Sequence, residues 1–226
     1  MTIKVEVTTD LILSLYKRLD DLFPWQKRWY AQRFQRGRSL HKGRQIGADY
    51  YFALEAVLDA CLTGRNKIFI EYVSPDPEDD FISNVAQYIG FFLGRNIETG
   101  TRVITLSNGA ELSFLPDNNL LWAGLCGDTY LSEWAYFTNP WNCIRSAYAV
   151  TSNVKWRLTF YSSIDDHAAG KDVDLSRRWY HDSVPFLPHE CTEAHCAKVN
   201  RMPGFYTDSH FRQVVLCQLP EWSSSL

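Results

Sequence analysis

Short apolar segments alternate with stretches of helical periodicity along this 226-residue chain, and few folds accommodate that order. The apolar segments are short and lack strict polar alternation, so they are predicted to be strands buried on both faces of a sheet. Strands that alternate with helices form a mostly parallel α/β sheet with helices on both faces. The predicted strands are Asn66–Val73, Asp128–Ser132 and Lys155–Tyr161, and the predicted helices are Ala48–Leu62, Pro77–Leu93, Phe137–Ala149 and Leu175–Tyr180.

One pair of strands is predicted to be antiparallel. Asn108-Gly109 separates the apolar segments Arg102–Ser107 and Ala110–Leu115. An Asn-Gly pair between two such segments is a strong hairpin signal, because both residues tolerate the positive φ angles of a tight turn.

The first 36 residues are predicted to be a helical lead-in to a single α/β domain that spans residues 37–226. Thr9 or Asp10 is a suitable cap for a first helix. Pro24 begins a second helix, which is predicted to end at Arg36.

The charge balance excludes one class of protein. With 23 basic and 26 acidic residues the net charge is −3, so the chain is not a uniformly basic nucleic-acid binder. A local basic track stays open, with a solvated helix face as the alternative. No apolar run is long enough to span a membrane, and the N-terminus lacks a signal peptide. The candidate track consists of Arg28, Arg33, Arg36 and Arg38.

The six cysteines have no disulfide spacing, so reduced and mostly buried thiols are expected. Four potential zinc ligands do lie close together, namely His189, Cys191, His195 and Cys196. Zinc sites separate their two ligand pairs, and this cluster does not. A polar loop or hairpin is therefore the preferred interpretation, and zinc is not expected.

The stretch from His41 to Asp49 lies between a short strand and a helix, where α/β proteins bind phosphate. It does not match the usual G-x-x-x-x-G-K-[ST] loop, because Ala48 and Asp49 occupy the positions of Lys and Ser/Thr. By itself this stretch is equally typical of an ordinary strand–turn–helix corner with two glycines.

A series of motifs nevertheless follows in one order between residues 22 and 219. They are Phe23-Pro24-Trp25-Gln26, Gly43-Arg44-Gln45-Ile46-Gly47, Tyr50-Tyr51-Phe52-Ala53, Leu106–Ala110, Leu112–Leu115, Gly127–Glu133 and Lys155–Ser163. This order resembles the ATPase domain of the large terminase subunit of tailed phages, the ATP-driven motor that packages double-stranded DNA into capsids. The family's deviant Walker A loop has the form Ser-Arg-Gln-hydrophobic-Gly-(Lys or Ala)-Thr. The resemblance implies a P-loop NTPase-like fold that uses ATP and Mg²⁺.

The resemblance also implies roles for individual residues. Gln26 corresponds to the residue that reads adenine, and Lys42 or Arg44 to the early cation of the loop. Glu133 and Arg44 are the catalytic candidates, and Glu133 would polarise the attacking water. Ser162 and Ser163 match the motif that couples nucleotide state to motion. The nucleotide-binding set is Gln26, Lys42, Gly43, Arg44, Gln45, Ile46, Gly47, Ala48 and Asp49.

Three positions depart from the family pattern. Asp49 replaces the Walker A hydroxyl, Ser132 replaces the Walker B Asp, and Ile164 replaces a frequent proline. A carboxylate 4 Å from a phosphate costs about 4 kcal/mol at an effective dielectric of about 20, which favours impaired hydrolysis. Alternatively, Asp49 and Ser132 are a reciprocal exchange that still offers a carboxylate and a hydroxyl to Mg²⁺.

Two functions are therefore expected. The first is an impaired ATPase-domain homologue, of phage-satellite or prophage type. It would bind the small terminase, the portal or a large terminase in the bacterial cytoplasm, and it would redirect or block packaging. Its oligomeric state stays open. The second is the active ATPase domain of a packaging motor, in which the basic track would bind double-stranded DNA. No nuclease domain is expected after residue 219, and the altered Walker residues favour a free-standing protein over an excised domain. Aromatic candidates for a protein interface are Trp134, Tyr136, Trp141, Trp179 and Trp222.

Overall fold

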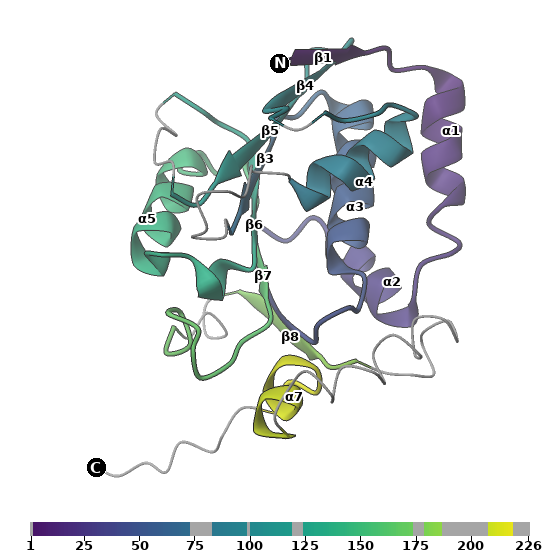
Figure 1. Ribbon diagram of the computed structural model, residues 1–226. Coiled ribbons are helices and arrows are strands. Elements are labelled where there is room, and N and C mark those ends of the chain that lie inside the picture. The colour runs from purple at the N-terminus through teal and green to yellow at the C-terminus, as the bar shows by residue number, and fades with distance from the viewer. Residues whose placement is uncertain are drawn as a thin grey trace.

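The computed structural model describes residues 2–72, 83–98, 100–118, 124–173, 179–186 and 208–218. Within these ranges one eight-stranded sheet has the order β1-β4-β5-β3-β6-β7-β2-β8 (Figure 1). Every neighbouring pair is parallel except β4 and β5. The strands are β1 Thr2–Val5, β2 Gly37–Lys42, β3 Lys67–Glu71, β4 Val103–Leu106, β5 Glu111–Pro116, β6 Asp128–Ser132, β7 Leu158–Ser162 and β8 Tyr180–Val184.

Helices cover both faces of the sheet. Figure 1 shows α1 to α4 on one side and α5 on the other, which confirms the predicted mostly parallel α/β fold. The helices are α1 Thr9–Lys17, α2 Pro24–Ala31, α3 Ala48–Thr63, α4 Asn84–Leu93, the 3₁₀ turn η1 Trp134–Tyr136, α5 Pro140–Val150 and α7 Asp208–Val214. None of these helices is both long and apolar enough to cross a membrane.

The largest helix, α3, lies between the sheet and α4 and α1, so it is buried around most of its circumference. Tyr51 and Phe52 are fully buried, and the Phe52 ring stacks on Tyr161 of β7 with centroids 4.3 Å apart. A helix that is apolar on nearly all sides requires such a central place. It ends at Gly64, whose φ of 68° is the left-handed conformation that glycine adopts without strain.

The predicted hairpin is confirmed. Thr105 pairs with Glu111 across the turn, and Gly109 has a φ of 91°. The Asn108 side chain also donates hydrogen bonds of 2.9 Å to the carbonyl oxygens of Ala60 and Cys61, which fixes the hairpin against the end of α3.

Three predicted elements differ from the structure. Residues 2–5, within the expected helical lead-in, form the edge strand β1, which pairs with β4. Helix α2 ends at Ala31 instead of Arg36, and turns follow it. Tyr180, the predicted end of a helix, begins strand β8. Both missed strands lie at sheet edges, where short strands carry polar residues and lack the apolar signature of central strands.

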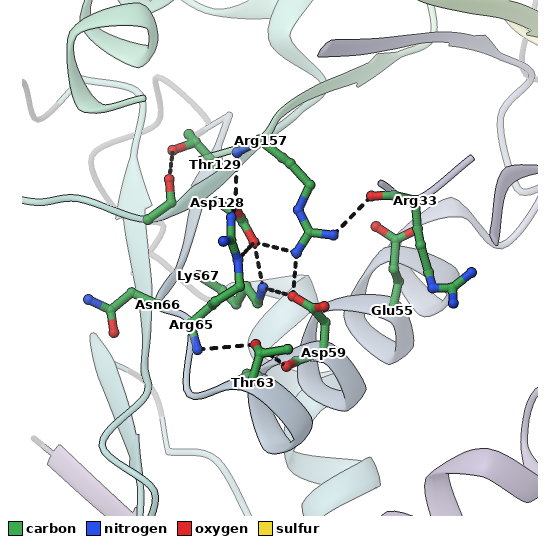
Figure 2. A network of polar contacts seen from close by, with 12 residues as sticks. Arg33, Glu55, Asp59, Thr63, Arg65, Asn66, Lys67, Asp128, Thr129 and Arg157 are labelled. Atoms are coloured by element: carbon green, nitrogen blue, oxygen red, sulfur yellow. Dashed lines mark hydrogen bonds and ion pairs between the residues drawn. The ribbon is translucent and has the colours of Figure 1, made fainter. Parts of the chain in front are cut away.

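A network of buried charged residues lies at the end of the sheet where β3, β6 and β7 begin (Figure 2). The fully buried Lys67 ammonium forms ion pairs with Asp59 of α3 and, at 2.6 Å, with Asp128 of β6. Arg157 Nη2 lies 2.5 Å from Asp59 and 2.7 Å from Asp128, and Arg65 forms a further ion pair with Asp128. The network therefore fastens the end of α3 to the starts of three strands.

The four cysteines in the described ranges carry free thiols, as expected. Burial raises the pKa of Cys61 to about 11 and that of Cys143 to about 12. Those two thiols are therefore protonated at neutral pH, whereas Cys126 is exposed.

Candidate functional site

The predicted phosphate loop connects the carboxyl end of β2 to the first turn of α3. Lys42 is the last residue of β2, and Ala48 is the first of α3. Gln45 and Gly47 between them have positive φ angles of 64° and 78°. Gly47 is the N-cap, and its lack of a side chain leaves the helix without a side-chain cap. The N–H groups of the first turn therefore point out of the helix end, where they favour an anion.

Lys42 and Glu133 face each other across this loop. Glu133 follows β6 and has a left-handed φ of 52°, which turns its side chain toward the Lys42 ammonium, and the two form an ion pair. The second carboxylate oxygen accepts hydrogen bonds from the Ser163 N–H at 2.9 Å and the Ser163 hydroxyl at 3.1 Å. Burial raises the pKa of Glu133, but Lys42, the Ser163 N–H and Arg44 together lower it overall, so Glu133 is a carboxylate at neutral pH.

The two altered Walker positions are in direct contact. The Ser132 hydroxyl donates a 3.0 Å hydrogen bond to Asp49 Oδ1. Burial raises the pKa of Asp49, and the nearby Glu133 raises it further while Lys42 opposes them. Tyr161, which is paired with Ser132 in the sheet, is fully buried, and its hydroxyl lies next to the Asp49 carboxyl and the Ser132 hydroxyl. A carboxyl, a hydroxyl and a phenol thus lie together at the base of the loop.

Gln26 reaches the loop from α2. Its Oε1 accepts a 2.9 Å hydrogen bond from the Phe23 N–H, and its Nε2 donates a 3.1 Å hydrogen bond to the Gly47 carbonyl. The side chain is 2% exposed. Gln26 therefore joins the start of α2 to the loop, and its contact with adenine stays a prediction.

A cavity of about 440 Å³ lies over the loop. Its volume is within the range of about 300–1,000 Å³ that is usual for ligand sites. Of the lining residues, Tyr50, Asn84 and Tyr88 were not predicted. Asn84 and Tyr88 belong to α4, and nothing local in their sequence indicates that α4 borders the loop. The predicted residues among the lining are Lys42, Arg44, Gln45, Ile46, Gly47, Ala48, Asp49 and Glu133.

These residues fit a nucleoside triphosphate with a divalent cation. The first turn of α3 and the Lys42 ammonium are donors for phosphate oxygens. Asp49 and Ser132 are oxygen donors, the class that Mg²⁺ prefers. Ser162 lies next to the same carboxylate, with its hydroxyl 3.3 Å from Glu133 Oε2.

Arg38, one member of the predicted basic track, is buried inside the protein. Arg38 is 1% exposed, because it lies on the side of β2 that faces α3. It forms a bidentate ion pair with Glu55, with contacts of 2.5 and 2.9 Å, and so is not available to DNA. Arg28 and Arg36 are exposed, and Arg33 is half-buried with its guanidinium 4.1 Å from the Tyr30 ring centroid. The predicted exposure of Arg38 was wrong, because β2 lies between β7 and β8 and is buried on both faces.

The aromatic residues predicted for a protein interface differ in how exposed they are. Trp134 is 3% exposed and belongs to the core on the α5 side of the sheet, so it is not a surface residue. Tyr136 and Trp179 are half-buried, and Trp141 is 56% exposed. Trp222 lies outside the described residues, as do His189, Cys191, His195 and Cys196. In the part of the chain that the structure describes, no three potential metal ligands of the His, Cys, Asp or Glu type gather.

Residues 40–163, more than half of the chain, match the family model described as terminase large subunit, T4likevirus-type, N-terminal. The probable terminase ATPase subunit of Haemophilus phage HP1 is 36% identical over 148 residues, which are 64% of this chain and 23% of that protein. The terminase ATPase subunit of Escherichia phage P2 is 30% identical over 171 residues, which are 74% of this chain and 26% of that protein. The chain thus spans about a quarter of the length of these relatives.

Solved structures show the same fold at low sequence identity. The large terminase of the thermophilic bacteriophage D6E, in complex with ADP, matches with a TM-score of 0.63 and 12% identity, over 86% of this chain and 53% of that one. The large terminase of bacteriophage HK97 matches with a TM-score of 0.60 and 16% identity, over 88% of this chain and 50% of that one.

Proposed function

The chain belongs to the terminase large-subunit family, and we propose that it is an ATPase-domain protein of phage DNA packaging that binds ATP at residues 42–49 but hydrolyses it slowly. It acts in the cytoplasm of the bacterial host, where it binds other packaging proteins and redirects or blocks packaging. The candidates for the partner are the small terminase, the portal and a complete large terminase.

ATP binding rests on one observation, the convergence of Lys42, Glu133 and Ser163 on the loop at the start of α3. In the proposed complex, Lys42 and the first N–H groups of α3 hold the phosphates. Glu133 orients the attacking water, and Ser163 holds Glu133 in place. Mg²⁺, when bound, neutralises charge on the phosphates.

Slow hydrolysis follows from Asp49. Its carboxyl is hydrogen-bonded to Ser132 and has a raised pKa. When ionised, Asp49 repels the phosphates, and when protonated it is a poor ligand for Mg²⁺. The Lys42–Glu133 ion pair adds a second obstacle, because both groups must separate before either one serves ATP.

The Asp49–Ser132 hydrogen bond also supports a second candidate, an active ATPase domain that translocates double-stranded DNA. The carboxylate and the hydroxyl have exchanged positions yet remain 3.0 Å apart, so together they present the same two groups to Mg²⁺. In that case Asp49 would supply the carboxylate and Ser132 the hydroxyl for Mg²⁺, which reverses the positions of the two groups.

Calorimetric titration of ATP and a non-hydrolysable analogue, with Mg²⁺ and with EDTA, distinguishes the two candidates. The proteins are the wild type, Asp49→Thr/Ser132→Asp, and Asp172→Thr as an exposed control. We expect micromolar binding by the wild type with little dependence on Mg²⁺. The double variant should bind ATP in a Mg²⁺-dependent way, and it should hydrolyse ATP at least tenfold faster than the wild type. Strong Mg²⁺ dependence and rapid turnover of the wild type would support the active motor, and absence of wild-type binding would refute both.

The packaging role needs its own measurement. Size-exclusion chromatography of the purified protein with the small terminase, the portal and the large terminase of the same phage reports complex formation directly. A complex with one of them supports the proposed role, and failure to bind any of the three contradicts it.

A further inference from the structure

The first two N–H groups of the phosphate loop are bound by the C-terminal part of the described chain. The Gly43 N–H donates a 2.8 Å hydrogen bond to the Val184 carbonyl, and the Arg44 N–H donates one of 2.6 Å to the Val214 carbonyl. The Phe186 N–H donates a 2.9 Å bond to the Val215 carbonyl, which joins the end of β8 to the end of α7. Val214 and Val215 are fully buried. The end of α7 therefore lies directly on the entry to the loop.

Glycine at position 43 makes this contact possible. A Cβ on Gly43 would lie 2.4 Å from the Val215 carbonyl oxygen and 2.7 Å from the Phe186 nitrogen, and both are backbone atoms that cannot rotate away. In this chain, backbone from residues 186 and 215 fills the space that a serine side chain would need.

Gln213, next to Val214, contacts the loop that follows β7. Its Nε2 donates a 2.8 Å hydrogen bond to Asp166 Oδ2, and its Oε1 accepts a 3.1 Å bond from the Asp166 N–H. Gln213 is 3% exposed. Asp166 follows Ser163 by three residues, and Ser163 holds Glu133 through two hydrogen bonds. Gln213 and its neighbour Val214 thus touch the loops that follow both β7 and β2.

We infer that Gln213 is a positioning residue of the nucleotide site, and that the end of α7 holds the phosphate loop and the Ser163 loop in register. This inference deepens the proposed function and rests on it. A displacement of α7 moves both loops together, because its backbone and the Gln213 side chain are bonded to one loop each. The relative placement of Lys42 and Glu133 then depends on residues 213–215.

The reciprocal exchange Gln213→Glu and Asp166→Asn tests this inference. Gln213→Glu alone places two carboxylates against each other, whereas the double variant restores one donor and one acceptor with the positions exchanged. Asp166→Ala removes only the bond from Gln213 Nε2 to Asp166 Oδ2 and keeps the backbone bond at residue 166; because Asp166 is exposed, this change is not expected to unfold the protein. Arg212→Ala, an exposed change on α7 that preserves the backbone, is the matched control.

Hydrogen exchange at the Gly43 and Arg44 amides, measured by NMR without nucleotide, is the first readout. We expect exchange about tenfold faster in Gln213→Glu and Asp166→Ala, and wild-type rates in the double variant and in Arg212→Ala. The affinity for a non-hydrolysable ATP analogue should follow the same order. Unchanged exchange in both single variants refutes the inference, as does a double variant without rescue. If the wild type binds no nucleotide, the proposed function fails while the exchange data still decide the role of Gln213.

Discussion

Replacing Lys67 with Met should destabilise the protein more than any other single change to a lysine of the described chain. The Lys67 ammonium is fully buried and lies between the carboxylates of Asp59 and Asp128, which are 12% and 1% exposed. Methionine has a similar volume, so the change removes the charge and leaves little cavity. Breaking a buried ion pair by removing one partner costs about 3–5 kcal/mol. For a chain of this size, that corresponds to a fall in Tm of roughly 6–20 °C.

Urea unfolding followed by tryptophan fluorescence measures this loss. Lys155→Met is the matched control, since Lys155 is exposed and its ammonium only lies 4.4 Å from the centroid of the Trp156 ring. The control should change the free energy of unfolding by less than about 1 kcal/mol. Lys67→Met/Asp59→Leu should recover part of the loss, because Asp128 keeps Arg65 and Arg157. A Lys67→Met variant within about 1 kcal/mol of the wild type would show that the arginines alone satisfy both carboxylates.

Three further predictions concern stability and the site. Gly43→Ser should lower the free energy of unfolding by about 1–3 kcal/mol in chemical denaturation, because its Cβ meets the Val215 carbonyl; unchanged stability contradicts the close packing. Ser163→Ala removes one hydrogen bond to Glu133 and should lower kcat about three- to tenfold with KM unchanged, and a rise in KM alone would place Ser163 in substrate binding. Burial raises the pKa of Glu71 to about 7, above its unfolded value of about 4.3. Between these pH values the folded state keeps a proton that the unfolded state has lost, so the free energy of unfolding falls as the pH rises. Glu71→Gln should therefore flatten the pH dependence of thermal stability between about pH 4 and 7, and an unaltered slope would exclude Glu71 as its source.

The central strands and the phosphate loop could be predicted because their signals are local. The segment around Ile68 and Ile70 is continuously apolar, as expected of a strand buried on both faces, and Asn108-Gly109 specifies its own turn. The motifs also placed Lys42 and Glu133 at the ends of β2 and β6, where the structure brings them together.

The remaining contacts depend on residues that are far apart in the sequence. The Arg44 N–H bonds to a carbonyl at position 214, and Gln26 bonds to Gly47, through no pattern that a short window contains. Arg38 looked like part of a basic surface because its partner Glu55 lies 17 residues away on α3. In each case the tertiary fold supplies the partner, and local periodicity carries no information about it.

The charge network has a consequence for movement. Helix α3 has 16 residues and so is about 24 Å long. Asp59 near its far end is fixed to two cations, whereas its first turn carries the phosphate loop. Glu55, one turn before Asp59, is also held by Arg38, so any movement of α3 is expected to turn about residues 55–59. The displacement then grows along the helix and is largest at Gly47. When nucleotide is added, the signal of a spectroscopic probe near Thr63 should therefore not change, whereas that of a probe near Tyr50 should.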